Sequence, residues 1–263
     1  MHYIFDIISD TYIETWPDLD LSMIATSPYC IIAGGIGSHR EEVMNFLTDI
    51  QQSYQGIFYI DGDDEHYHEL PFGLNNSYKD LKATLQSHDE LVYLHHHVVV
   101  SKNVAIVGIN GWWNFAFNPA ISPEQAIAHW CETYSFTLAN AEDVIQHANN
   151  DAVYLRNTLI KLQSMKEVEK IIVVSHTVPL FELIYHDPRI NYSYQSSLMG
   201  NNQLEDILDD NLTDKIHTWI FGHYGGDIDQ TINGIRFINN CRNAASDIYA
   251  KNVYNPKRLS IKT

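Results

Sequence analysis

The 263-residue chain is poor in cysteine, in basic residues and in long apolar segments. Its three cysteines, Cys30, Cys131 and Cys241, form no close pair and no zinc-type spacing, which argues against a disulfide framework. No apolar run approaches the roughly 20 residues that span a bilayer, and residues 1–9 are predicted to form a strand rather than a leader segment. Together these features predict a cytoplasmic protein without a membrane partner.

The charge balance restricts the partners of this protein. Lysine and arginine number 16, against 33 aspartates and glutamates, which gives a formal net charge of −17. Proteins that bind DNA or RNA use cationic side chains to displace counterions from phosphates, so the balance disfavours a nucleic-acid partner. The net negative charge disfavours a small phosphorylated ligand less than it disfavours a nucleic acid. Because hydrophobic residues make up 45% of the chain and charged residues 19%, the composition is typical of a globular protein with a sizeable core.

Short β-rich segments alternate with helical ones, which predicts an α/β fold. Strands are predicted at residues 3–8, 30–33, 57–60, 170–174 and 218–221, and hairpins at 98–109 and 230–239. Ser38 and Ser77 are predicted to cap helices, and Ser122-Pro123 opens a mostly helical insertion at about residues 120–169. No repeat or linker divides the sequence, so we predict a single domain over residues 1–263.

Five short segments after predicted strands carry the polar residues from which function can be argued. They are residues 9–14 with Asp10, 33–37, 61–65 with Asp63 and Asp64, 175–176 with His176, and 222–225 with His223. In this order they resemble the metal-binding loops of calcineurin-like metallophosphoesterases. The resemblance extends from Met1 to about Arg242. It implies a four-layer αββα sandwich of two mixed sheets and suggests a phosphate-ester hydrolase.

Several ligand positions of that family are replaced in this chain. Tyr12 and Gly225 stand where the family has histidines, and Gly35 stands where it has the aspartate that bridges two metal ions. Two dications roughly 3.5–4 Å apart require an anionic bridge, which glycine cannot supply. The resemblance therefore implies a degenerate member in which the first metal site keeps Asp10 alone.

The second metal site keeps more of its donors. Asp63, in place of an asparagine, offers a carboxylate, and His176 and His223 offer imidazoles, with Asp10 as a possible fourth ligand. This set suits one divalent ion (Mn, Fe or Zn) with open water positions. The alternative is that no metal binds and these groups hydrogen-bond one another. Asp64, in place of the histidine that assists the leaving group, is either a protonated general acid or a solvated loop residue.

Two hypotheses for function remain open. The first is a diverged metallophosphoesterase-like protein that lacks ordinary two-metal hydrolysis and binds a ligand or a protein partner through its remodelled cleft. The second is an active phosphoesterase, with one metal ion or none, that acts on a small phosphorylated substrate. In that case Asp64, His176 and His223 are the candidate catalytic residues. The sequence alone does not decide whether the protein is an enzyme.

Four further residues are expected to line the cleft. They are Tyr12, Gly35, Gly225 and Arg242. Tyr12 is predicted to fill the space of the missing ion, or to donate a hydrogen bond to a phosphate. Arg242 is predicted to form an internal ion pair, with Asp10 as the candidate acid, or to receive a phosphate.

Other histidines and aromatic residues carry weaker signals. His66 and His68 lie close to Asp63 in sequence and are candidates for substitute metal ligands. The run at residues 95–97 has three consecutive histidines, but side chains alternate faces along a strand, so these are predicted not to converge. The aromatic segment 112–117 is predicted to pack in the core, with a ligand pocket or a subunit interface as alternatives.

Overall fold

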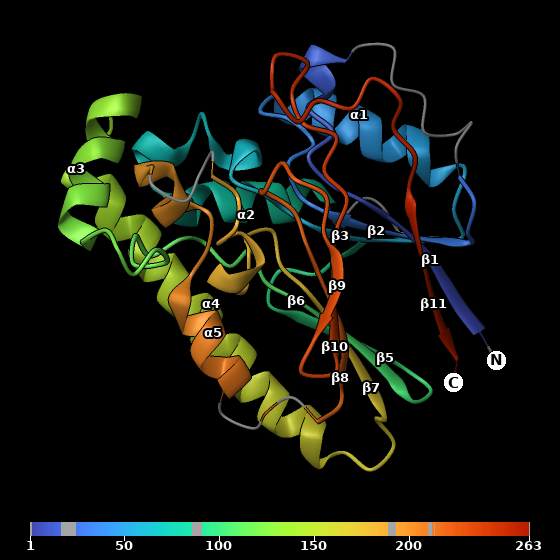
Figure 1. Ribbon diagram of the computed structural model, residues 1–263. Coiled ribbons are helices and arrows are strands. Elements are labelled where there is room, and N and C mark those ends of the chain that lie inside the picture. Colours follow the sequence, from blue (N-terminus) through green and yellow to red (C-terminus); the bar gives the residue numbers. More distant parts are fainter. Residues whose placement is uncertain are drawn as a thin grey trace.

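Two β-sheets pack face to face in the computed structural model, which describes residues 2–16, 25–85, 91–188, 193–209, 212 and 214–262 (Figure 1). The first sheet has the order β11-β1-β2-β3-β4, and the second has the order β5-β6-β7-β8-β10-β9. The first comprises β1 (His2–Ile8), β2 (Tyr29–Ala33), β3 (Gly56–Ile60), β4 (Leu91–Tyr93) and β11 (Lys257–Lys262). The second comprises β5 (His97–Ser101), β6 (Val104–Gly108), β7 (Lys170–Val174), β8 (Ile216–Phe221), β9 (Asp229–Ile232) and β10 (Ile235–Asn239).

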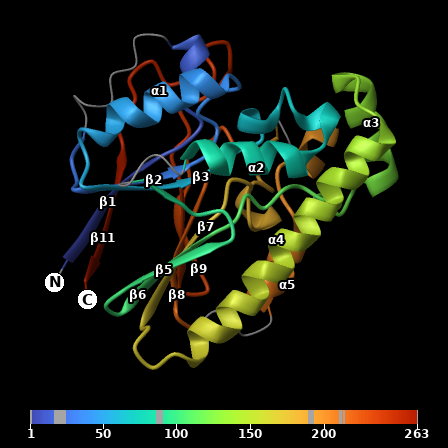
Figure 2. The ribbon, with the colours of Figure 1, turned by 180° about the vertical axis from the view of Figure 1, so that it is seen from behind.

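Both sheets are mixed, as the sequence predicts. Neighbouring strands in the middle of each sheet are parallel, whereas β11, β5 and β9 pair antiparallel at the edges. The hairpins β5–β6 and β9–β10 confirm the two predicted from sequence. Strands β1 and β11 lie side by side, so the two ends of the chain meet at one edge of the molecule (Figure 2).

Side chains alternate between the two faces of each strand, and this alternation divides the core into layers. In β2, Ile31 and Ala33 face the second sheet, where they pack with residues such as Ile172 of β7. Cys30 and Ile32, on the opposite face of β2, pack beneath helix α1 (Arg40–Gln51). Because both faces are covered, the central strands are almost continuously apolar, which is why they are recognisable in the sequence.

Helices cover the outer face of each sheet. Helix α1 and helix α2 (Leu74–Leu85) lie on the first sheet, through Val43, Leu47 and Leu81 among others. Helix α4 (Leu138–Ser164) and helix α5 (Asn202–Asp209) lie on the second. Figures 1 and 2 show these groups of helices on opposite sides of the sheets. The predicted four-layer αββα sandwich is confirmed.

Two of the predicted helix starts are wrong. Helix α1 begins after His39, and its N-terminal side is held by the carboxylate of Glu14, which accepts hydrogen bonds from the backbone N–H groups of Ser38 and His39. An acid from a distant loop thus replaces the serine cap. Ser77 lies inside α2, where its hydroxyl contacts His66 instead of the helix end.

The predicted helical insertion contains helix α3 (Pro123–Tyr134) and all of α4. Each begins with a reciprocal cap, formed by Ser122 with Gln125 and by Thr137 with Asn140. The aromatic segment packs against this insertion, with Trp112 and Phe115 fully buried, as predicted. None of the helices in the described ranges is both long enough and apolar enough to cross a bilayer.

Candidate metal site and adjoining cavity

The five loops identified in the sequence meet at one end of the sheets. Parallel strands end on the same edge, so the loops that follow them lie together. The backbone N–H of Asp10, after β1, donates to the carbonyl oxygen of Gly34, after β2, at 2.9 Å. In the second sheet, the N–H of Gly222 donates to the carbonyl oxygen of His176 at 2.8 Å. The loops are therefore fixed to one another by their backbones.

Glu65 holds two of these loops in place, a role that the sequence analysis missed. Its buried carboxylate accepts hydrogen bonds from the N–H groups of Ile36 and Gly62, both at 2.8 Å, and of Gly35 at 3.2 Å. The loops approach so closely that a Cβ atom at Gly62 would lie 2.6 Å from the Gly35 nitrogen. The only sequence signal for Glu65 is its place at the end of the third segment.

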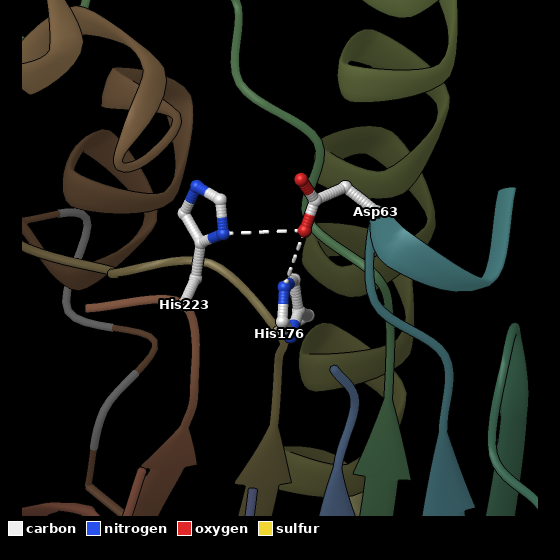
Figure 3. Close-up of side chains that lie close together, drawn as sticks. All are labelled: Asp63, His176 and His223. Atoms are coloured by element: carbon white, nitrogen blue, oxygen red, sulfur yellow. Dashed lines mark hydrogen bonds and ion pairs between the residues drawn. The ribbon is translucent and has the colours of Figure 1, made fainter. Parts of the chain in front are cut away.

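Asp63, His176 and His223 converge at the centre of this end (Figure 3). Oδ1 of Asp63 lies 2.9 Å from Nε2 of His176 and 3.2 Å from Nδ1 of His223. One ligand atom from each residue lies within 4.8 Å of the others. His176 is completely buried, while Asp63 and His223 are partly exposed. These are the three residues that the sequence proposes for the second metal site.

Backbone carbonyl groups fix which nitrogen of each imidazole faces Asp63. A carbonyl oxygen can only accept, so Nδ1 of His176 donates to Ala33 at 2.8 Å, and Nε2 of His223 donates to Leu198 at 3.1 Å. When both rings are neutral, the inner nitrogen of each therefore presents a lone pair. Two lone pairs and a carboxylate oxygen then face one another, and this arrangement requires a proton or a metal ion among them.

In the absence of a metal ion, protons meet this requirement. Burial alone would lower the pKa of His176, but its hydrogen bond with Asp63 and the charges of Asp10 and Asp63 raise that pKa to about 10. Burial likewise opposes ionisation of Asp63, but the charges of the two histidines and their hydrogen bonds lower its pKa well below the ordinary value. The metal-free cluster is therefore an ion pair.

Asp10 lies beside the cluster, and its carboxylate accepts hydrogen bonds from groups outside the cluster's three ligand atoms. Its Oδ2 accepts hydrogen bonds from the backbone N–H of His223 and from the thiol of Cys241, each at 3.0 Å. Gly35 packs directly against it, since a Cβ atom at Gly35 would lie 2.6 Å from Asp10 Oδ1. The space that a bridging aspartate would need is therefore taken by the Asp10 side chain.

A cavity of about 330 Å³ adjoins the cluster. Its walls include Asp63, His223, Asp64 and Tyr12, together with Trp113 and Trp130 from the aromatic segment and the insertion. Burial, followed by the charges of Asp63 and Glu65, raises the pKa of Asp64 well above its ordinary value. The protonated form of Asp64 is therefore favoured relative to that of an ordinary aspartate. The aromatic segment both packs in the core and shapes this cavity.

The other two cleft residues lie in different surroundings. The Arg242 guanidinium stacks over the indole of Trp16, with its Cζ 4.2 Å from the ring centroid. Among the described residues, this cation–π contact takes the place of the predicted ion pair with Asp10, whose carboxylate accepts hydrogen bonds from His223 and Cys241 instead. Gly225 faces Tyr249 of the C-terminal segment, whose Cδ2 would lie 2.9 Å from an added Cβ.

The neighbouring histidines are not placed as the sequence analysis expected. Nε2 of His66 is 2.9 Å from Asp61 Oδ2, and its Nδ1 is 2.6 Å from the Ser77 hydroxyl, so both ring nitrogens are occupied inside the core. His66 is therefore a structural residue and His68 is exposed. His95 and His96 do converge, because His96 has a left-handed backbone (φ 50°) that interrupts the alternation of side chains.

Introducing by Gly35→Asp the aspartate that the resembled family has at this position is expected to lower the free energy of unfolding by about 2–4 kcal/mol without creating two-metal activity. Gly35 has φ +69°, and the added Cβ would clash with Asp10. Gly234→Asp is the matched control, because Gly234 has φ +84° with no atom within 4 Å of an added Cβ. Urea unfolding and manganese-dependent hydrolysis of phosphodiesters check both parts. Robust hydrolysis by Gly35→Asp would contradict the assignment of the lost first site.

Comparison with known proteins shows the fold. No protein-family model matches the chain. An uncharacterised protein, L509 of Acanthamoeba polyphaga mimivirus, is 21% identical over 204 residues, which cover 74% of this chain and 71% of the relative. The structure of a phosphopantetheinyl hydrolase from Mycobacterium tuberculosis matches with a TM-score of 0.70 at 17% identity, over 92% of this chain and 90% of that one. The fold is thus of the metallophosphoesterase type.

Proposed function

We propose that this protein binds a single divalent metal ion through Asp63, His176 and His223, and that it holds a small phosphorylated ligand in the adjoining cavity. The observation that carries the proposal is the convergence of three ligand atoms whose histidines have their outer nitrogens held by carbonyl groups. A carboxylate and two imidazoles suit Mn, Fe or Zn. The protein is then a degenerate metallophosphoesterase, without ordinary two-metal hydrolysis.

The donors fit one ion and not two. Gly35 supplies no bridging carboxylate, and Oδ2 of Asp10 already accepts two hydrogen bonds. Tyr12, at a former ligand position, has a phenol whose pKa is raised well above its ordinary value, chiefly by the charge of Asp64 and by burial. A neutral phenol is a poor metal ligand. The first site therefore offers no usable set of donors.

The charge of the cavity makes ligand binding depend on the ion. Three aspartates, Asp63, Asp64 and Asp247, line it, and its described walls contain no lysine or arginine. A phosphate group would meet a field of the wrong sign there. A bound divalent ion supplies positive charge that attracts phosphate oxygens and polarises them. Asp64, whose pKa is raised by burial and by the charges of Asp63 and Glu65, would add a hydrogen-bond donor there in its protonated form.

A specific observation also supports the second hypothesis, an active single-metal hydrolase. Asp64 lies on the cavity wall, and burial raises its pKa, which favours the protonated form that a general acid requires. Asp64, His176 and His223 would then be the catalytic residues. Hydrolysis of a phosphomonoester or phosphodiester that falls about 10²-fold or more in Asp64→Asn would favour this activity. Absence of turnover with every substrate in manganese would leave ligand binding as the function.

The proposal is tested by measuring manganese binding to chelator-treated protein and inorganic phosphate binding with and without manganese. We expect one Mn²⁺ per chain, and phosphate binding only in its presence. His176→Ala is expected to abolish both, whereas the control His186→Ala, at an exposed histidine, leaves both unchanged. Equal manganese binding by the two variants would overturn the proposed site. Phosphate binding without the ion would overturn the proposed role of the metal.

A further inference from the structure

A second group of potential metal ligands lies where the chain crosses from the first sheet to the second. His95 and His96 follow β4, the edge of one sheet, and precede β5, the edge of the other. The N–H of His96 donates to the carbonyl oxygen of Gly108 at 3.2 Å, which fixes the crossing segment to β6. The left-handed backbone of His96 places both imidazoles on the same side, with ring centroids 4.3 Å apart and an angle of 12° between the planes.

Asp151 of helix α4 closes this group from the other side. Its side chain is buried, with Oδ1 2.7 Å from Nε2 of His96 and Oδ2 accepting a hydrogen bond from the N–H of Gly111 at 2.7 Å. One ligand atom each from His95, His96 and Asp151 lies within 4.8 Å of the other two. The group shares no residue with the Asp63 cluster. It thus forms a separate set of two imidazoles and a carboxylate.

An unsatisfied nitrogen at this place indicates a ligand. Nδ1 of His95 is buried, and no hydrogen-bond partner lies near it among the described residues. Buried polar atoms in folded proteins nearly always have a partner, and the exceptions frequently mark an ion or a water molecule. The ring is held in position, because Tyr78 stacks on it with centroids 4.1 Å apart. Rotation of the ring within this stack is therefore restricted.

The group of His95, His96 and Asp151 is accessible from solvent. A cavity of about 350 Å³ is lined by His95 and His96, and Tyr93 and Lys82 also contribute to its walls. The side chain of His96 is 34% exposed, whereas Asp151 behind it is 1% exposed. A partly exposed outer ligand and a buried inner one are compatible with uptake of an ion from solvent.

We propose that His95, His96 and Asp151 form a second, independent binding site for a divalent transition-metal ion, of which Zn²⁺ is the best fit. Two imidazole nitrogens and one carboxylate oxygen are typical zinc ligands, and they leave a fourth position for water. An ion there ties the crossing segment to helix α4 and, through Gly111, to the start of the aromatic segment. It stabilises the junction of the two sheets and takes no part in the Asp63 site.

Zinc stoichiometry, measured by native mass spectrometry of chelator-treated protein, tests this site. We expect two Zn²⁺ per chain in the wild type, and one in His96→Ala and in Asp151→Asn. The control His97→Ala, at the exposed neighbouring residue, retains two. His96 is partly exposed, so its replacement carries little risk of misfolding. We count the ion as lost when the zinc affinity of that site falls by at least about tenfold.

The outcomes separate this inference from the proposed function. His176→Ala is expected to remove one ion and to leave the His96-dependent ion in place, so zinc should still raise the thermal stability of this variant. If His96→Ala and Asp151→Asn bind as much zinc as His97→Ala, the second site is overturned while the Asp63 site stands. If only the His96-dependent ion binds, the second site is supported and the proposed function fails.

Discussion

Replacing His66 by alanine is expected to lower the free energy of unfolding by about 3–5 kcal/mol. His66 and Asp61 form a completely buried pair, with Nε2 2.9 Å from Oδ2. Burial would raise the pKa of Asp61, but the hydrogen bond and charge of His66 outweigh it and lower that pKa far below the ordinary value. Without the imidazole, the buried carboxylate keeps hydrogen bonds from Tyr93 and Asn110. The remaining charge is then poorly compensated in the core.

The matched control is His68→Ala, two residues further along the same loop. His68 is exposed, so its removal is expected to change the free energy of unfolding by less than about 0.5 kcal/mol. Urea unfolding at constant pH measures both variants. His66→Ala should retain manganese binding where it is folded, because neither ring nitrogen of His66 faces the Asp63 cluster. A variant that kept its stability and lost manganese would show that His66 is a ligand.

The α/β class could be predicted from the sequence pattern because the central strands are covered on both sides, whereas the four-layer sandwich was implied by the resemblance of the five segments. A strand such as β7 is apolar at Ile171, Ile172, Val173 and Val174, since neighbours on either face exclude water from all four. The loops after such strands are then forced to one edge. The resemblance of the five segments, in their order after such strands, identified Asp63, His176 and His223, which come from three distant parts of the chain.

Contacts that depend on backbone conformation could not be predicted in the same way. The alternation rule separated His95 from His96, and it failed because one left-handed residue, His96, turned both rings to one side. Ser38 matched a helix cap, but the position was taken by Glu14, 24 residues earlier in the chain. Arg242 had a plausible acid in Asp10, but Trp16 lies beneath its guanidinium. In the last two cases a residue distant in sequence decided the contact.

Affinity for Mn²⁺ is expected to rise about tenfold for each pH unit between pH 6.5 and 8.5, or about a hundredfold over this range. Folding raises the pKa of His176 from 6.5 to about 10, so the metal-free protein holds a proton there throughout the range. An ion that takes the lone pair of Nε2 must displace this proton. Calorimetric titration in buffers of different ionisation enthalpy should show the release of about one proton per ion.

The raised pKa of His176 also determines whether the stability of the metal-free protein rises or falls with pH. Because the pKa is raised on folding, the protonated His176–Asp63 pair contributes its full stability below pH 6.5, and this contribution is lost as the pH rises toward about 10. Manganese should therefore stabilise the protein most at the alkaline end, where the proton competes least. His176→Gln should bind manganese weakly and remove this component of the pH dependence. A manganese affinity that is constant from pH 6.5 to 8.5 would show that the ion does not replace the proton on His176, and that the cluster binds metal elsewhere or not at all.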